Sequence, residues 1–233
     1  MKIKIYLDGA NLDEILKYKD DDRIKGFTTN PSLMRKAGVK NYMDFAEQLA
    51  EQIPKDKHVS LEVVADELPE MERQARKITD VSENFYAKIP ITNTKGQPTY
   101  DIIKTLGEDG VKVNVTAIMT ATQLNDLGKV LHKTTPSVVS YFAGRVSDTG
   151  ENPMSGVLNA HTIFHQHEGV EFLWASCRQV YNVYEADKVG CNIITVSSDI
   201  LEKLKLKGKI LADYSLETVK QFYQDALEAN YSL

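Results

Sequence analysis

One lysine lies in the middle of a segment that has the composition of a buried strand. The segment covers residues 85–92, and a turn follows at residues 93–96. Strand alternation puts Lys88 on the face opposite Ala87 and Ile89. A buried ammonium is costly, so we expect Lys88 to have a partner or a chemical task. The task that suits it is attack on a carbonyl to form a Schiff base, which needs a neutral amine and a lowered pKa. The alternative is a strand-end lysine that reaches solvent along its stem.

Polar residues recur near the carboxyl end of almost every other segment that alternates like a strand. Alternation places them on one face, opposite the apolar residues. They are Asp8, Thr28, Asn30, Glu62, Asn114, Thr116, Ser140, Arg145, Ser176 and Arg178, with the aromatic residues Phe142 and Trp174 on the same face. Taken alone, each has an ordinary interpretation, such as a turn-forming aspartate or a surface arginine. Gathered at one end of one cavity, they would have to satisfy one another's hydrogen bonds and would form a site.

Strands alternate with helices along the chain, and this order predicts how the polar residues are brought together. We expect strands at residues 3–8, 24–29, 58–64, 85–92, 111–118, 137–142, 170–175 and 192–196, and helices at 11–19, 42–53, 68–78, 98–106, 122–131, 158–167, 180–189 and 200–206. Strict alternation predicts a parallel sheet, and this number of units predicts an α/β fold, a single (β/α)8 TIM-barrel domain over residues 1–233. The alternative is an open doubly wound sheet, although no GxGxxG or P-loop motif follows the first strand.

A last amphipathic helix, at about residues 216–229, exceeds what the barrel needs. It packs either over its own barrel or onto a neighbouring subunit, and the sequence does not decide between the two. We expect the chain to form a homo-oligomer.

The inventory of inward-facing groups suits aldol chemistry on a phosphorylated sugar. A neutral lysine condenses with a ketone, and the iminium then accepts electrons when a carbon–carbon bond breaks. One carboxylate can take the proton from the hydroxyl that becomes an aldehyde, and the other can handle water together with a threonine hydroxyl. Two arginines at the rim suit a phosphate. This chemistry requires no metal. His165 and His167 stand two residues apart on an expected helix and so share no face.

Composition excludes several other classes of protein. The formal net charge is -5, and acidic and basic residues are mixed throughout, so no basic stripe indicates a nucleic-acid partner. No apolar run approaches the roughly 20 residues of a membrane span. The two cysteines, Cys177 and Cys191, are too few for a disulfide framework. We therefore expect a cytoplasmic protein without a nucleic-acid or membrane partner.

Several motifs in their order and spacing make this chain resemble the transaldolase family, specifically its small branch, which also contains fructose-6-phosphate aldolases. The resemblance covers almost the whole chain. The motifs are YLD at residues 6–8, GFTTNPSL at 26–33, LEV at 61–63, AKIPIT at 87–92, VNVT at 113–116, SYFAGR at 140–145 and ASCR at 175–178.

The resemblance implies a role for each candidate residue. Lys88 would be the Schiff-base lysine, Asp8 the acid–base group for carbon–carbon bond cleavage, and Glu62 and Thr116 would serve the catalytic water. Substrate contacts would come from Thr28, Asn30, Asn114, Ser140 and Phe142, with the phosphate bound by Arg145, Ser176 and Arg178. The implied reaction moves a dihydroxyacetone unit from sedoheptulose 7-phosphate or fructose 6-phosphate to an aldose phosphate, as in the pentose phosphate pathway. No cofactor is implied.

Three positions favour the transferase over the aldolase within this family. The aldolases carry Gln, Ala and Tyr where this chain has Glu62, Ser140 and Phe142. A tyrosine that shifts the protonation of the water would favour hydrolytic release, and Phe142 has no hydroxyl. Fructose-6-phosphate aldolase and a non-catalytic barrel that binds sugar phosphates remain the alternatives.

The chain also departs from the family pattern. Gly9-Ala10 follows Asp8, Cys177 replaces a phenylalanine, a loop at residues 146–157 has no clear role, and residues 195–198 replace a proline-bearing turn. These departures leave the acceptor sugar open.

Overall fold

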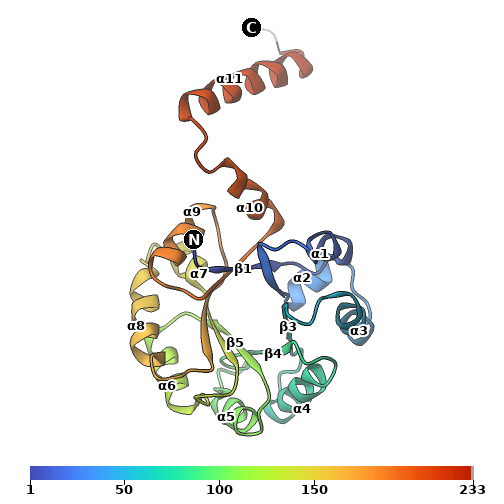
Figure 1. The fold of residues 1–233 in the computed structure, drawn as a ribbon, viewed down its shortest axis with the longest axis vertical. Coiled ribbons are helices and arrows are strands. Elements are labelled where there is room, and N and C mark those ends of the chain that lie inside the picture. Colours follow the sequence, from blue (N-terminus) through green and yellow to red (C-terminus); the bar gives the residue numbers. More distant parts are fainter. Residues whose placement is uncertain (232–233) are drawn as a thin grey trace.

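Eight parallel strands close into a barrel that is surrounded by helices (Figure 1). This computed structural model describes residues 1–231. The strands are β1 (Lys4–Asp8), β2 (Ile24–Thr28), β3 (His58–Glu62), β4 (Phe85–Pro90), β5 (Val113–Ile118), β6 (Ser137–Tyr141), β7 (Val170–Trp174) and β8 (Ile193–Val196). They are hydrogen-bonded in sequence order, and β8 returns to pair with β1. The prediction of a (β/α)8 barrel is confirmed, and the open doubly wound sheet is wrong.

The helices follow the strands in the expected order. They are α1 (Leu12–Tyr18), α2 (Pro31–Lys36), α3 (Tyr42–Gln52), α4 (Leu68–Thr79), α5 (Tyr100–Glu108), α6 (Ala121–Val130), α7 (Ala143–Asp148), α8 (Met154–Phe164), α9 (Tyr181–Lys188), α10 (Ser198–Lys203) and α11 (Leu211–Glu228), with a 3-10 turn at Leu204–Leu206. Each of the packed helices buries one face. On α4, for example, Met71, Ala75 and Ile78 are spaced to share one face and are buried against the strands.

Apolar side chains form two layers, one outside the strands and one inside the barrel. The outer layer lies between strands and helices and is the larger. The inner layer consists of Tyr6, Val138, Leu173, Ala175 and Ile193, with Tyr86 and Phe142 beside it. A (β/α)8 barrel is filled rather than hollow, and here the inner apolar side chains share the interior with buried polar residues such as Ser60 and Asn114.

Trp174 was predicted to share the inward face with Ser176 and Arg178, and this prediction is wrong. Trp174 is fully buried in the outer layer, and its neighbours Leu173 and Ala175 point inward. The physical reason lies at Ser176, whose φ of 63° is left-handed. The alternation of side chains between the two faces therefore stops before Ser176, and the direction of Ser176 does not predict that of Trp174.

The predicted loop at residues 146–157 contains two helical segments. Helix α7 ends within it at Asp148, and α8 starts within it at Met154. Helix α8 also ends earlier than predicted, so His165 is its C-cap and His167 lies beyond it. Among residues 1–231 no helix is long and apolar enough to cross a bilayer.

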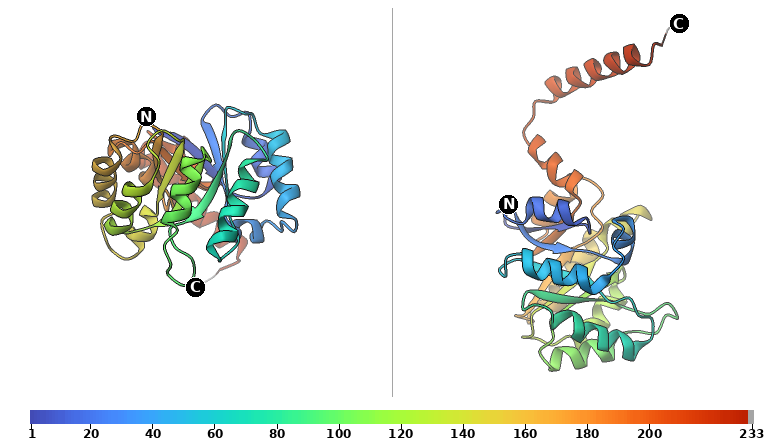
Figure 2. Two further views of the ribbon diagram at one scale, coloured as in Figure 1. Left: turned by 90° about the horizontal axis from the view of Figure 1, so that it is seen from below. Right: turned by 90° about the vertical axis from the view of Figure 1, so that its right-hand side faces the viewer.

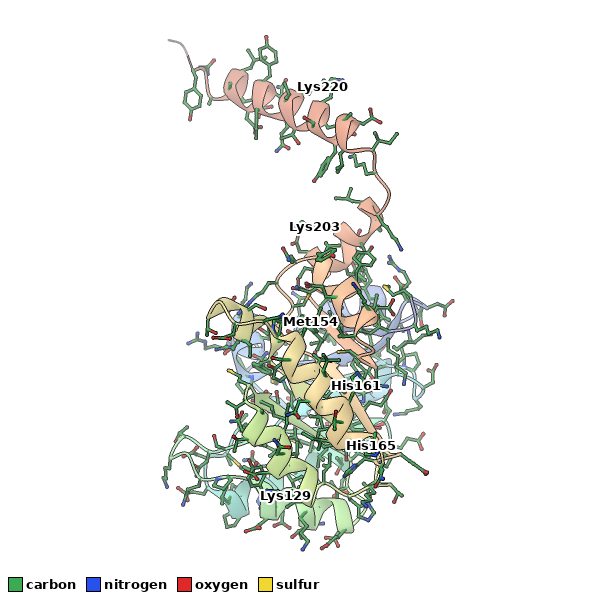
Figure 3. The ribbon with its side chains drawn as sticks, turned by 90° about the vertical axis from the view of Figure 1, so that its left-hand side faces the viewer. Lys129, Met154, His161, His165, Lys203 and Lys220 are labelled. Atoms are coloured by element: carbon green, nitrogen blue, oxygen red, sulfur yellow. The ribbon has the colours of Figure 1, made fainter. Side chains whose placement is uncertain are left out.

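Helix α11 stands apart from the barrel and begins at Leu211, earlier than the predicted 216. Figures 1 and 2 show it extending beyond α10 at one side of the molecule. Figure 3 shows the same separation between Lys220 on α11 and Lys203 on α10. None of its residues is buried, and its exposed large hydrophobic residues include Leu216, Val219, Phe222, Tyr223 and Leu227.

Candidate active site

Lys88 points into the barrel and has two polar partners there. Its Nζ lies 3.0 Å from Oε2 of Glu62, and it donates a hydrogen bond of 3.0 Å to the Thr29 carbonyl. Parallel pairing of β3 with β4 sets Glu62 directly beside Lys88. The Lys88 side chain is only 7% exposed, so it does not reach solvent along its stem.

Asp8 lines the same cavity as Lys88, and its carboxylate accepts the last hydrogen bond of a chain formed by two threonine hydroxyls. The Thr28 hydroxyl donates to Oδ1 of Asp8 at 2.8 Å and lies 2.5 Å from the Thr195 hydroxyl. Because the Thr28 proton is used on Asp8, the Thr195 hydroxyl must be the donor to Thr28. Closure of the barrel creates this arrangement, since β8 and β2 flank β1 on opposite sides.

Burial raises the pKa of Asp8 above its ordinary value. The positive charge of Lys88 and the hydrogen bond from Thr28 act in the opposite direction but are smaller effects. A carboxyl with a raised pKa holds a proton more readily near neutral pH, which suits a group that must both take and return one.

Asn114 and Ser140 are joined beneath the cavity. The Ser140 hydroxyl donates to Oδ1 of Asn114 at 2.6 Å, and Nδ2 of Asn114 donates to the Ser60 hydroxyl at 2.9 Å. Asn114 pairs beside Lys88 in the sheet and is fully buried. The carboxamide is therefore held within the barrel by two serines.

Thr116 also lines the cavity, and its hydroxyl is buried without a hydrogen-bond partner among the described residues. Thr116 lies in a register shift between β5 and β6, where Ala117 has a φ of 61°. Such irregularities re-aim side chains at the rims of barrels. A buried hydroxyl without a partner is costly, so Thr116 is a group for which a hydrogen bond from a water molecule or a ligand would be favourable.

Asn30 belongs both to the cavity wall and to the start of α2. Its Oδ1 caps the helix by accepting from the Leu33 amide at 3.0 Å, and Pro31 takes the first helical position. With the oxygen used in the cap, the Nδ2 hydrogens of Asn30 remain as donors.

The cavity itself has a volume of about 110 Å³ and lies at the carboxyl ends of the strands. Its wall brings together most of the predicted residues: Asp8, Thr28, Asn30, Lys88, Thr116, Ser140, Phe142, Arg145 and Ser176. Arg145 is exposed at the rim, where its guanidinium lies 5.8 Å from the centre of the Phe142 ring. Glu62 reaches the cavity through its contact with Lys88.

Arg178, like Glu62 and Asn114, is a predicted site residue outside the cavity wall, and unlike them it forms no hydrogen bond or ion pair with a residue of the candidate site among residues 1–231. It is half exposed and forms an ion pair with Asp148 at the end of α7. Its loop packs closely on that helix. A Cβ at Gly144 would lie 1.6 Å from the Ser176 carbonyl oxygen and 3.2 Å from Cγ of Arg178.

Sequence reasoning missed several residues of the site. Thr195, Leu173 and Ala175 also line the cavity, and Ser60 supports Asn114 from below. The sequence of β8 did not indicate which of its residues face into the barrel, because they are nearly all apolar. The polar Thr195 was the available signal, since it alone would gain from an inward position.

No group of three or more histidine, cysteine, aspartate or glutamate side chains in residues 1–231 is placed to hold a metal ion. The two cysteines, Cys177 and Cys191, are free.

Comparison with protein families gives one match over nearly the whole chain. Residues 5–233 match the family described as Transaldolase/Fructose-6-phosphate aldolase. A curated relative from Nitrosopumilus maritimus (strain SCM1), named "Probable transaldolase", is 33% identical over 204 residues, which is 87% of each chain. Another with the same name, from Methanococcus maripaludis (strain C5), is 33% identical over 225 residues, covering 93% of this chain and 99% of its own.

Solved structures support the barrel fold. The 3-hexulose-6-phosphate synthase from Salmonella typhimurium superposes with a TM-score of 0.57 at 15% identity, covering 85% of this chain and 89% of its own. The orotidine 5'-phosphate decarboxylase from Pyrococcus horikoshii OT3 gives a TM-score of 0.54 at 16% identity, with coverage of 83% and 88%.

Proposed function

This chain belongs to the transaldolase/fructose-6-phosphate aldolase family, and we propose that it is a transaldolase. The reaction transfers a dihydroxyacetone unit from sedoheptulose 7-phosphate or fructose 6-phosphate to an aldose phosphate through a Schiff base. One observation carries the proposal: Lys88 is buried at the carboxyl end of the barrel, in contact with one carboxylate and sharing its cavity with another.

Schiff-base formation begins with the neutral amine of Lys88. Its nitrogen attacks the ketone carbon of the donor to give a carbinolamine, which loses water to become an iminium. Glu62, 3.0 Å from Nζ, is placed to take the proton from the amine and return it to the departing hydroxyl. The partnerless hydroxyl of Thr116 would hold the water that leaves here and returns in the last step.

Carbon–carbon cleavage follows on the iminium. Asp8 removes the proton from the hydroxyl next to the bond that breaks, the bonding electrons move to the iminium, and an aldose phosphate leaves. The enamine on Lys88 then attacks the aldehyde of the acceptor, and Asp8 returns its proton to the new alkoxide. The raised pKa of Asp8, caused mainly by burial, suits this exchange.

The rim provides the phosphate contacts of this proposal. Arg145 and Ser176 line the cavity, and Arg178 lies just outside it with Asp148 as its partner. An exposed ion pair contributes about 0–1 kcal/mol, whereas a hydrogen bond to a charged group contributes about 1.5–3 kcal/mol. A phosphate could therefore draw Arg178 away from Asp148. Asn30, Asn114, Ser140 and Phe142 would surround the hydroxyls of the sugar.

Fructose-6-phosphate aldolase is the second candidate, since the matched family contains both activities. Glu62, Ser140 and Phe142 favour the transferase, because the aldolase resemblance requires Gln, Ala and Tyr there. A non-catalytic barrel that binds sugar phosphates is the third. It gives no reason for a lysine to be buried between Glu62 and the Thr29 carbonyl.

We also propose a homo-oligomer, with α11 in contact between subunits. A helix that buries none of its residues and exposes Phe222 at 66% needs an apolar partner to be stable. The two free cysteines support a reducing, cytoplasmic location. A role in the pentose phosphate pathway would follow from the proposed substrates.

Borohydride trapping tests the proposed function directly. The protein is reduced in the presence of fructose 6-phosphate and digested, and the peptides are analysed by mass spectrometry. We expect a sugar-derived adduct on Lys88 and none in Lys88→Met, while Lys104→Met, at an exposed site on α5, is trapped like the wild type. An unmodified Lys88 would overturn the proposal. Free dihydroxyacetone formed as fast without an aldose phosphate as with one would instead identify an aldolase.

A further inference from the structure

A chain of hydrogen bonds runs through the barrel from its amino end to the candidate active site. Nε2 of His58 lies 2.5 Å from the Ser60 hydroxyl, which accepts from Nδ2 of Asn114 at 2.9 Å. Oδ1 of Asn114 in turn accepts from the Ser140 hydroxyl at 2.6 Å, and Ser140 lines the cavity. The three residues at the start of this chain are buried, so their hydrogen bonds cannot be exchanged with water.

Two directions of this chain preserve every hydrogen bond within it. In the first, Ser140 donates to Asn114, Asn114 to Ser60, and Ser60 to His58. In the second the carboxamide is turned over, and every donor becomes an acceptor. The carboxamide orientation in the structure is that of the first. In that direction Nε2 of His58 is the acceptor in contact with the Ser60 proton, which places the proton of a neutral ring on Nδ1.

His58 is held so that a neutral ring is favoured. Its ring stacks on Tyr86 at a centroid distance of 3.9 Å and lies 4.9 Å from the ring of Tyr6. Burial, aided by Lys4 and Lys112, lowers the pKa of His58 to about 3. Gly26 lets the neighbouring strand approach His58 closely, since a Cβ there would lie 2.8 Å from the His58 carbonyl oxygen and 2.9 Å from its Cβ.

We propose that His58 is a positioning residue: its unprotonated Nε2 accepts from Ser60 and so sets the direction of the chain that ends at Ser140. Because the Ser140 proton is used on Asn114, Ser140 presents oxygen lone pairs to the cavity and accepts from a hydroxyl of the substrate. The inference rests on the function proposed for this cavity, and it gives a substrate role to a residue at the opposite end of the barrel.

Removal of the acceptor nitrogen should reverse the chain. In His58→Phe the ring remains to stack on Tyr86, but the Ser60 proton has no acceptor there. The Ser60 hydroxyl then turns to Asn114, the carboxamide rotates, and Ser140 receives an N–H. Its own proton then points into the cavity, so the sugar hydroxyl that donates to Ser140 in the wild type must turn and accept instead, at the expense of its other hydrogen bonds.

The first measurement is the tautomer of His58 in the wild-type protein, from nitrogen-15 NMR of labelled histidine. We expect a proton on Nδ1 and a bare Nε2. A proton on Nε2, or on both nitrogens near neutral pH, would overturn the proposal. This measurement does not depend on activity. A protein with the expected tautomer but without a borohydride adduct on Lys88 would refute the proposed function and not the direction of the chain.

The second measurement is a double-mutant cycle on the KM for fructose 6-phosphate. His58→Phe should raise KM by about fivefold with kcat changed less than about twofold, as expected for one neutral hydrogen bond to substrate. In a Ser60→Ala background the same change should have no further effect, because the link to Asn114 is already broken. An equal rise in both backgrounds would show a packing role for His58 and contradict the proposal. Tyr86→Phe, which keeps the stacked ring, is the control and should leave KM unchanged.

Discussion

Lys88 on β4 and Glu62 on β3 are paired in the sheet, and their charged atoms lie 3.0 Å apart inside the barrel. The contact joins an amine to a carboxylate, so Lys88 is not an isolated buried charge. Both side chains come from strands, and neighbouring strands hold them at a separation that loops could not maintain. The pair explains why a lysine is tolerated at a buried position.

Glu62→Gln should slow the steps that involve water and leave carbon–carbon cleavage possible. General acid–base groups contribute about 10²- to 10⁴-fold, so we expect turnover to fall within this range. Borohydride should still modify Lys88, and the adduct should have the mass of a three-carbon unit. An adduct that retains the whole donor sugar would assign the cleavage step to Glu62 instead.

Asp8→Asn should block cleavage after the Schiff base has formed. We expect turnover to fall by about 10²-fold or more and the trapped adduct on Lys88 to have the mass of the intact donor. Loss of trapping would contradict the division of roles between Asp8 and Glu62.

Asp8→Asn should also stabilise the fold at neutral pH. Because burial raises the pKa of Asp8, the folded state binds more protons than the unfolded state between the ordinary and the raised value. The contribution of this carboxyl to the free energy of unfolding therefore falls as pH rises through that window. The asparagine side chain does not titrate, so the variant does not lose this stability. Its Tm should exceed that of the wild type at pH values above the raised pKa and equal it at pH values below the ordinary pKa. Thermal unfolding of both proteins at several pH values checks this, and a lower Tm for the variant at neutral pH would show that Asp8 is net stabilising.

Arg178→Ala should weaken binding of phosphorylated sugars alone. A charge-assisted contact of about 1.5–3 kcal/mol corresponds to a rise in KM of about 10- to 100-fold. Asp148→Asn is the matched variant: it releases Arg178 from its partner, so KM should fall slightly. Steady-state kinetics with and without the phosphate on the substrate measure both effects. If the two substrates respond equally to Arg178→Ala, the arginine has no phosphate role.

Phe142→Tyr should shift the reaction toward hydrolytic release. The ring lines the same cavity as Lys88 and Thr116, and we expect an added hydroxyl there to bind the water proposed for hydrolysis of the Schiff base. We expect release of dihydroxyacetone without an acceptor to rise by about tenfold, as for a contribution of about one hydrogen bond, while transfer falls. Phe142→Leu, which adds no hydroxyl, separates this effect from altered packing.

Gly144→Ala should disrupt the rim while the barrel remains folded. The added Cβ would lie 1.6 Å from the Ser176 carbonyl, which is fixed backbone, so α7 or the loop after β7 must move. We expect a loss of stability of about 1–3 kcal/mol and a large rise in KM for sugar phosphates. Gly150→Ala, in the turn that follows α7 and with open space around it, is the comparison: its φ of 85° predicts a loss of stability but no change in KM. An unchanged KM in Gly144→Ala would show that the rim does not bind phosphate.

Local pattern was sufficient for the strands and for most inward-facing residues. Lys88, Asp8 and Glu62 follow from period-two alternation, because the pleat sends neighbouring side chains to opposite faces whatever the rest of the chain does. The number of strand–helix units then predicted closure into a barrel. Alternation failed at Trp174, because the left-handed backbone at Ser176 interrupts the pleat within the motif.

The partners of these residues depended on the tertiary structure. Glu62 lies beside Lys88 through the register of β3 and β4, and Thr195 reaches Thr28 only because the barrel closes with β1 between β8 and β2. The ion pair of Arg178 with Asp148 could not be predicted, because Asp148 lies on α7 and the sequence analysis expected a loop there. The amphipathic character of α11 is visible in its sequence, but its separation from the barrel is not, because a local pattern says which face needs a partner and not where the partner lies.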